Sequence, residues 1–184
     1  EVHEILNQDF KHLDLDIEVD FEKKEILGAA HWTIKKNNPA SKEIVFDTYE
    51  LTIDSVKLDN NTAAIYQLAA KDTILGSALT VLMHDSTKTV DIYYRTQEEA
   101  TALQWLDASQ TFGKKQPFLY TQGESIYTRS WIPSQDGPGV RFTYNATVKV
   151  PKELRALMSA DNDTARAVDG IYVFKMDQAI PSYL

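Results

Sequence analysis

The sequence contains no cysteine, which excludes disulfide bonds, thiolate metal sites and cysteine nucleophiles. It also has no apolar run close to the roughly 20 residues that cross a bilayer, so we expect no membrane span. Residues 1–10 lack the basic and then apolar pattern of an export signal. We therefore expect a soluble protein that is cytoplasmic or, where a signal has already been removed, periplasmic or extracellular.

The chain has fewer basic than acidic residues. The chain has 19 lysine and arginine residues against 27 aspartates and glutamates, which gives a net charge of -8. An acidic chain repels phosphate backbones, and no basic stripe interleaved with aromatic residues offsets this repulsion, so nucleic acid is not expected as a partner. The hydrophobic share of 43% and the charged share of 25% are those of an ordinary globular protein, and 184 residues suffice for one domain.

The common signatures of hydrolytic and nucleotide chemistry are missing. The chain has no Gly-x-Ser-x-Gly motif and no glycine loop of the phosphate-binding type. A zinc peptidase needs two histidines one helical turn apart, with a carboxylate that activates water. His3-Glu4-Ile5-Leu6-Asn7 begins like such a helix but has Asn7 in place of the second ligand. We expect no metal in this segment.

Alternation of apolar and polar residues is the strongest pattern that the sequence does contain. His12 to Phe21 alternate without a break, and Ile26 to Ile34 follow after a short turn, so the two stretches predict a β-hairpin. In the second strand Gly28 and Ala30 permit close packing. Further strands are predicted at Glu43 to Asp47, Leu51 to Leu58, Ala63 to Leu68, Ala78 to Met83, Val90 to Arg95, Val140 to Val150, Leu157 to Ala160 and Ile171 to Lys175.

Many short strands separated by polar or glycine-containing turns predict an all-β fold, namely a mostly antiparallel β-sandwich in a single domain over residues 1–184. Gln97 to Gln110 depart from this rhythm, because Glu98-Glu99-Ala100 favour a helical turn. There we expect an irregular loop with a short helix packed by Trp105.

The stretch from Gln116 to Pro133 is the one around which we expect the chain to be organised. A strand from Phe118 to Tyr120 breaks at Gln122-Gly123-Glu124-Ser125 and is predicted to resume from Ile126 to Pro133. A glycine inside a strand marks a bulge or a place where another group approaches the backbone. The Glu124 carboxylate is therefore expected to have a defined direction.

Two alternatives remain open for this region. Glu124 and Asp136 flank the same segment, as a carboxylate pair of a glycosidase would, although most such pairs are solvated surface. Gln135 to Gly139 are typical of a structural turn in which the aspartate accepts backbone N–H groups and the glycines take positive φ. A separate alternative is a stand-alone β-sandwich module that binds carbohydrate or protein, with an aromatic platform formed by Tyr93, Tyr94, Trp105, Tyr120, Tyr127 and Trp131.

A series of short motifs occurs in a fixed order: Ala102-Leu103-Gln104-Trp105-Leu106, Gln110-Thr111, Pro117-Phe118-Leu119-Tyr120-Thr121-Gln122, Arg129, Pro133, Gln135-Asp136, Val150-Pro151-Lys152-Glu153-Leu154 and Leu157-Met158-Ser159-Ala160. This series closely resembles the N-terminal domain of the family M1 zinc aminopeptidases, in the branch that contains leukotriene A4 hydrolase and aminopeptidase B. Lys11 to Thr33 fit the opening strands of that domain, and Ile180 to Leu184 look like its junction with the next domain.

The resemblance implies a saddle-like β domain that packs against a thermolysin-like catalytic domain of the same polypeptide. That catalytic domain carries the zinc helix and a Gly-x-Met-Glu-Asn strand, and neither motif is in this sequence. We therefore expect zinc in the parent enzyme with its ligands after residue 184, no cofactor in this segment, and no turnover by the segment alone. An isolated first domain exposes the surface that meets its catalytic partner, so we also expect self-association.

The resemblance also assigns roles to the central loop. By position, Gln122 would line the pocket for the first side chain of a peptide substrate and Glu124 would bind its free α-amino group, with Gly123 and Ser125 as neighbouring substrate-binding positions. The named branch has glutamine in place of Glu124. A charged anchor prefers a cationic amine to an uncharged lipid tail, so the difference favours peptidase over epoxide hydrolase activity. The alternative is a Glu124 that is solvated or paired with Arg129.

Overall fold

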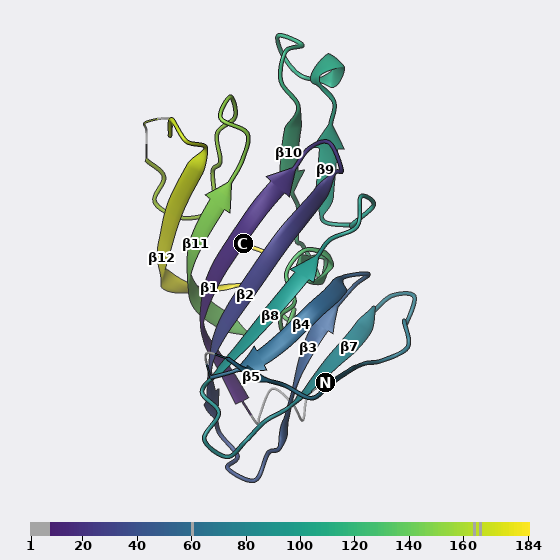
Figure 1. Ribbon diagram of the computed structural model, residues 1–184, viewed down its shortest axis with the longest axis vertical. Coiled ribbons are helices and arrows are strands. Elements are labelled where there is room, and N and C mark those ends of the chain that lie inside the picture. Colours follow the sequence, from purple (N-terminus) through teal and green to yellow (C-terminus); the bar gives the residue numbers. More distant parts are fainter. Residues whose placement is uncertain (1–7, 60, 164, 166) are drawn as a thin grey trace.

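The computed structural model describes residues 8–59, 61–163, 165 and 167–184, so the His3 to Asn7 segment lies outside the described residues. Figure 1 shows that the described residues form strands and no α-helix. Two short 3-10 helices occur, η1 (Ala108–Gln110) and η2 (Thr128–Ser130). The prediction of an all-β fold is confirmed. The strands are β1 (Gln8–Asp20), β2 (Glu25–Lys36), β3 (Glu43–Thr48), β4 (Thr52–Leu58), β5 (Thr62–Ala63), β6 (Tyr66–Leu68), β7 (Ser77–Leu82), β8 (Thr89–Arg95), β9 (Leu103–Leu106), β10 (Phe118–Thr121), β11 (Arg141–Lys149) and β12 (Ile171–Pro181).

The largest sheet has seven strands in the order β12-β11-β1-β2-β8-β4-β5. Its β1 and β2 form the predicted antiparallel hairpin, with Leu13 opposite Trp32 and Leu15 opposite Ala30. On its other edge β1 pairs with β11 in parallel, and His12 lies opposite Thr143. Every other strand pair in the described part of the chain is antiparallel. The sheet is therefore mixed, because β11 reaches β1 after a long connection and not through a hairpin.

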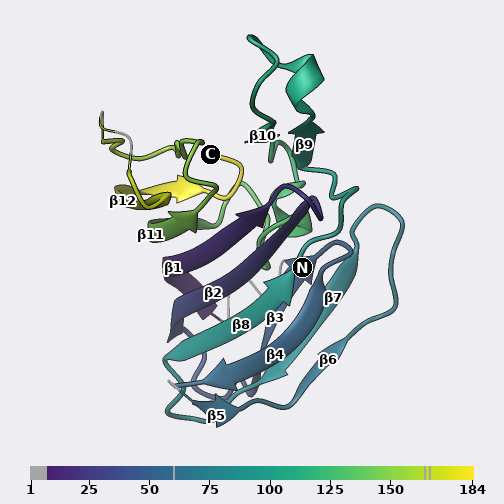
Figure 2. The same cartoon turned by 45° about the horizontal axis from the view of Figure 1, so that its top comes forward.

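A three-stranded sheet, in the order β3-β7-β6, lies behind the β2-β8-β4 part of the large sheet (Figure 2). The core between the two sheets is aromatic. The Trp32 ring is fully buried and packs edge to face against Phe10 at 4.9 Å and against Phe142 at 4.7 Å, while Phe46 of β3 meets Phe10 at 5.3 Å. The indole N–H donates to the Pro133 carbonyl at 2.9 Å, so the one polar atom of the ring is satisfied.

The prediction of close packing at Gly28 is confirmed. A Cβ atom placed on Gly28 would lie 2.3 Å from Cζ of Tyr94, which is opposite it on β8. The Tyr94 ring is 1% exposed and occupies the space that a larger residue on β2 would need. Glycine at this position therefore leaves room for the Tyr94 ring where β2 pairs with β8.

The predicted loop over Gln97 to Gln110 is partly wrong. A short helix does form within this range, but it is the three-residue η1 and does not lie at Glu98 to Ala100, the residues that favoured it. Leu103 to Leu106 are a strand, β9, that pairs antiparallel with β10. The two strands form an arm that extends beyond the sheets in Figure 1. The Trp105 ring packs edge to face against Phe21 at 5.4 Å, so it anchors this arm to the end of the β1–β2 hairpin. Four residues with a single partner strand give too weak a local pattern to be recognised.

Four other predicted strands need correction. Ile126 to Pro133 do not resume the strand, because a turn and η2 occupy this stretch. Ala63 to Leu68 are divided between β5 and β6, which belong to different sheets. Leu157 to Ala160 form no strand. β12, predicted to end at Lys175, continues to Pro181.

Candidate functional site

The loop from Gln122 to Ser125 leaves the end of β10 and is held by hydrogen bonds on both sides. The Gln122 N–H donates to the Ala102 carbonyl at 2.8 Å, and the Tyr127 N–H donates to the Gly123 carbonyl at 2.9 Å. The Glu124 N–H donates to Oε1 of Gln122 at 2.6 Å, and the peptide bond between Glu124 and Ser125 is cis. The three hydrogen bonds fix the backbone, while Gln122, Glu124 and Ser125 stay exposed.

Gly123 is the buried member of the loop. A Cβ atom at this position would lie 2.4 Å from Oγ1 of Thr128 and 3.1 Å from Cα of Tyr183. The prediction that another group approaches the backbone at this glycine is confirmed, and the groups are the Thr128 hydroxyl and Tyr183 of the segment after β12. The Thr128 hydroxyl donates to the Ser182 carbonyl at 3.1 Å, which ties the segment to η2.

A buried ion pair fixes η2 beside the loop. Nε of Arg129 lies 3.3 Å from Oδ2 of Asp136, and the two side chains are 5% and 0% exposed. The Arg129 N–H donates to the same oxygen at 3.0 Å, and Nη2 reaches Oδ2 of Asp47 at 3.4 Å. The Asp136 N–H donates to Asp47, and the Ser182 hydroxyl donates to Oδ1 of Asp136. This network joins η2, β3 and the segment after β12.

A surface turn completes the arginine's environment. Nη1 of Arg129 donates to the Leu75 carbonyl at 2.9 Å. Asp72 accepts hydrogen bonds from the N–H groups of Leu75 and Ile74, which hold the pKa of the Asp72 carboxyl below its ordinary value. The ionised Asp72 thus orders the turn whose carbonyl binds Arg129. The sequence analysis did not single out Asp47, Thr128 or Ser182, because their roles depend on contacts far apart in the chain.

The alternatives left open for the carboxylates can now be compared with the geometry. Asp136 is buried in the ion pair and is not available to a solvated substrate, so the arrangement does not favour a glycosidase pair with the exposed Glu124. The structural interpretation of Gln135 to Gly139 is confirmed, although Gly137 and Gly139 do not have the expected positive φ. Pairing of Glu124 with Arg129 is wrong, because the guanidinium is bound by Asp136, Asp47 and Leu75.

The Glu124 carboxylate has no ion-pair partner among the described residues. Its neighbours on the loop are uncharged, and the buried Arg129 is already bound by Asp136 and Asp47. An exposed carboxylate on a fixed backbone can accept hydrogen bonds from a cation. Because the loop is already ordered in the folded chain, binding does not carry the entropy cost of ordering it.

The aromatic residues of the alternative binding module do not share one surface. Tyr93 and Tyr94 are adjacent on β8 and therefore point to opposite faces of the sheet, and Tyr94 is buried. Trp105 and Trp131 pack against the core. Tyr120 and Tyr127 are the exposed members.

No group of three or more histidine, aspartate or glutamate side chains lies together in a way that would hold a metal ion, as far as the described residues extend. These residues therefore do not fit a zinc site of their own. Across the same residues, no helix is long and apolar enough to cross a membrane.

The fold recurs in proteins of known structure. Leukotriene A4 hydrolase from Saccharomyces cerevisiae superposes with a TM-score of 0.85 at 34% identity, over 96% of this chain and 28% of that one. The M1 zinc metallopeptidase from Deinococcus radiodurans superposes with a TM-score of 0.73 over 96% of this chain and 40% of that one, and at 18% identity it shares the fold. The architecture is that of the β domain of zinc metallopeptidases.

The sequence comparisons are more specific. A family model described as the Peptidase M1 N-terminal domain matches residues 10–184, and the chain belongs to this family. The chain is 37% identical to leukotriene A-4 hydrolase of Xenopus laevis, over 95% of its length and 30% of that protein. It is 34% identical to leucine aminopeptidase 2 of Kluyveromyces lactis, over 95% of its length and 26% of that protein. The chain thus spans less than a third of these relatives.

Proposed function

We propose that this chain is the substrate-anchoring domain of a zinc aminopeptidase, which removes N-terminal amino acids from peptides. The observation that carries the proposal is the exposed Glu124 carboxylate on a loop whose two sides are fixed. In this role Glu124 binds the free α-amino group of the peptide, Gln122 lines the pocket for its first side chain, and Gly123 and Ser125 shape the backbone between them. Membership of the M1 family and the relative named leucine aminopeptidase 2 support it.

The chemistry of an exopeptidase requires such an anchor. A terminal ammonium held by a carboxylate makes a charge-assisted hydrogen bond worth about 1.5 to 3 kcal/mol. This contact also sets the register of the substrate, because fixing the amine leaves only the first peptide carbonyl over the reacting centre. The groups that hold zinc and activate water belong, in this proposal, to a catalytic domain of the same polypeptide after residue 184. Residues 1–184 alone are then inactive.

The charge of Glu124 bears on the choice of substrate. The relatives carry the names of a leukotriene A-4 hydrolase and of a leucine aminopeptidase. A carboxylate attracts an ammonium group, whereas an uncharged lipid chain gains nothing from it and leaves the charge desolvated. The proposal therefore assigns peptides as substrates.

The test uses the full-length polypeptide and a chromogenic aminoacyl substrate. Glu124→Ala is expected to lower kcat/KM by about tenfold to a few hundredfold, the factor that corresponds to roughly 1.5 to 3 kcal/mol. Glu124→Gln, which keeps an acceptor without the charge, should lose less. Glu22→Ala is the matched control, because Glu22 is also exposed but lies in the β1–β2 turn.

Two results would contradict the proposal. One is an unchanged kcat/KM in Glu124→Ala, which would remove the anchoring role. The other is turnover of the same substrate by residues 1–184 supplied with zinc, which would place the reacting centre inside this chain.

A further inference from the structure

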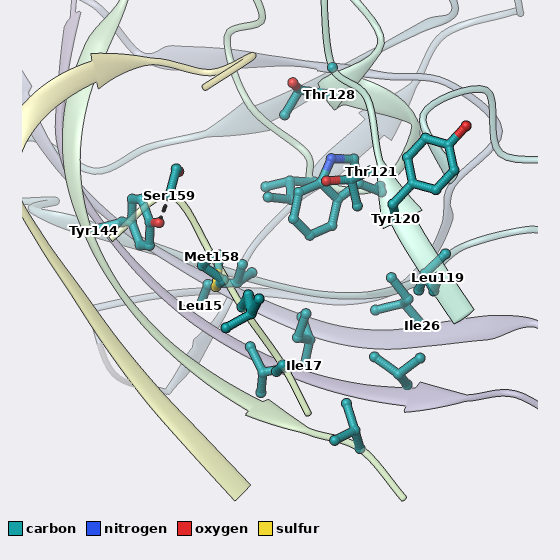
Figure 3. A pocket seen from close by; sticks show the side chains of 18 of the residues that line it. Leu15, Ile17, Ile26, Leu119, Tyr120, Thr121, Thr128, Tyr144, Met158 and Ser159 are labelled. Carbon is teal, nitrogen blue, oxygen red and sulfur yellow. Dashed lines mark hydrogen bonds between the residues drawn. The ribbon is translucent and has the colours of Figure 1, made fainter. Parts of the chain in front are cut away.

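An apolar cavity of about 480 Å³ lies against the inner face of the large sheet (Figure 3), and Gly123 of the candidate loop also lines it. Its floor is formed by side chains of β1, β2 and β11, among them Leu15, Ile17 and Ile26. β10 forms one wall with Leu119 to Thr121. The segment from Leu154 to Ser159 forms another, and Tyr183 and Leu184 also line the cavity.

The wall from Leu154 to Ala160 has the side-chain pattern of a β-strand without being one. Leu154, Ala156, Met158 and Ala160 are half-buried, while Arg155, Leu157 and Ser159 between them are exposed. This period of two is the pattern that predicted a strand here. The hydroxyl of Tyr144, whose pKa is raised by burial, meets Oγ of Ser159 at 3.1 Å and keeps the segment on the sheet.

The backbone of this wall is satisfied on one side. The side chain of Asn162 accepts from the Met158 N–H at 3.0 Å and donates to the Met158 carbonyl at 2.8 Å, as a neighbouring strand would. In extended chain the backbone groups of adjacent residues point to opposite sides, so those of Leu157 and Ser159 point away from Asn162. Within the described part of the chain, the main chains of Leu157 and Ser159 make no hydrogen bond.

The opposite wall is open as well. β10 belongs to a two-stranded sheet in which Leu119 lies opposite Trp105 of β9, so its second edge has no partner strand among the described residues. Unpaired strand edges bind extended chain, which supplies backbone hydrogen bonds while its alternate side chains enter pockets. An apolar floor between two such edges is therefore shaped for a β-strand.

We infer that this groove is filled by a β-strand from the polypeptide that follows Leu184, apolar at every second residue and paired with the edge of Leu154 to Ala160. The inference rests on the proposed function, in which this chain is one domain of a longer peptidase. Tyr183 and Leu184 line the cavity, so the next residue of such a polypeptide starts inside the groove. The relatives that the chain matches are longer, since it spans 26% to 30% of them.

The backbone argues against a small apolar ligand as the occupant. A hydrocarbon that covered the groove would shut water away from the N–H and C=O groups of Leu157 and Ser159, which are now exposed, without replacing their hydrogen bonds, and buried backbone groups are nearly always paired. A strand fills the cavity and also supplies hydrogen-bond partners for these groups.

The test is amide hydrogen exchange, followed by mass spectrometry, on the full-length polypeptide. Residues 154–160, and a stretch directly after Leu184, are expected to exchange at least about 100-fold more slowly than unstructured peptides of the same sequence. Leu157→Pro, which removes the donor N–H, should return both stretches to fast exchange. Leu157→Ala is the matched control, because it removes the exposed side chain, keeps the N–H and should keep the protection.

Fast exchange of residues 154–160 in the full-length polypeptide would overturn the inference, and binding of an apolar dye by the same sample would then identify a ligand cavity. Protection that grows with protein concentration would overturn it in favour of a second copy. Aminopeptidase activity, measured on the same sample, separates the two proposals. Protection in an inactive protein supports the strand and refutes the function, while fast exchange in an active one does the reverse.

Discussion

Two glycines that look alike in the sequence have different positions in the fold. Gly123 is enclosed by Thr128 and Tyr183, whereas a Cβ atom on Gly137 would meet nothing within 4 Å. At Gly123 the side chain that would have to move is a buried threonine whose hydroxyl holds the Ser182 carbonyl. Substitution there must therefore displace the loop or the segment after β12.

Gly123→Ala is expected to lower kcat/KM of the full-length enzyme about tenfold or more, because a displacement of about 1 Å at a positioning group has effects of this order. Gly137→Ala, measured in parallel with the same substrate, should leave kcat/KM unchanged, since its backbone is not in the left-handed region and its surroundings are open. Equal activity of the two variants would show that the close contact at Gly123 does not position the loop.

Tyr94 illustrates a residue with an unsatisfied polar atom. Among the described residues its buried hydroxyl finds no hydrogen-bond partner, and burial raises the pKa of this phenol above its ordinary value of 10.0. Because the pKa is raised in the folded state, the neutral ring contributes full stability below pH 10. Above pH 10 the unfolded chain ionises first and the free energy of unfolding falls.

Tyr94→Phe is expected to raise the free energy of unfolding at pH 7 by about 1 kcal/mol, since a buried unpaired polar group costs about 1 to 3 kcal/mol. Above pH 10 the variant should also lose less stability than the unsubstituted chain. Some loss should remain, because burial also raises the pKa of Tyr144. Denaturant unfolding over this pH range measures both effects. A variant that is less stable at pH 7 would show that the hydroxyl has a partner in solution.

At the scale of elements, η2 owes its position to a charge pair and not to apolar packing. All three of its residues are buried, and Arg129 is bound by Asp136 on the strand side and by Leu75 on the surface side. Removing one member of a buried pair leaves the other charge uncompensated, which costs about 3 to 5 kcal/mol.

Asp136→Ala is therefore expected to lower the free energy of unfolding by about 3 kcal/mol or more. Glu124→Ala is its control, because an exposed carboxylate without a partner should change stability by no more than about 0.5 kcal/mol. Urea unfolding of both variants measures the two changes in the free energy of unfolding. Similar losses in the two would mean that the Arg129 pair contributes no more than a surface charge does.

Strands with an uninterrupted period of two could be predicted from the sequence. β2, β8 and β11 are where the alternation placed them within one or two residues, whereas β1 begins at Gln8, four residues before the predicted start at His12. The errors have physical causes. The buried Arg129 reads as an outward charge of a strand, but it is neutralised by Asp136, a contact that alternation does not reveal. β9 depends on its pairing with β10, and Leu157 to Ala160 have the alternation of a strand but lack a partner.

The candidate loop could be located from the sequence, because a glycine beside a carboxylate interrupts an apolar run. The residues that surround the loop could not be predicted from the sequence. Asp47, Thr128 and Ser182 belong to the hydrogen-bond network beside the loop, and only the tertiary fold brings them together. The anchoring roles of Gln122 and Glu124 remain predictions from the resemblance.

For the whole molecule, an open apolar groove beside the unpaired edges of β10 and of Leu154 to Ala160 favours self-association of residues 1–184 when no further polypeptide is present. Leu157 at the rim is 67% exposed, and a net charge of -8 opposes association only weakly at physiological salt. Light scattering of this chain is expected to give a mass above that of a monomer at high concentration, and Leu157→Asp should reduce it. A single monomeric species at all concentrations would refute this expectation.

The parallel pairing of β1 with β11 sets the order in which the chain can fold during its synthesis. His12 meets Thr143, which lies 131 positions later. At roughly 5 to 20 residues per second, a ribosome needs about 7 to 26 s to make the intervening chain. Until then β1 has no neighbour on its outer edge, although β2 can already pair with β8, which precedes β11 in the chain. Translation rate, and not the intrinsic speed of hairpin formation, therefore limits when the large sheet can close.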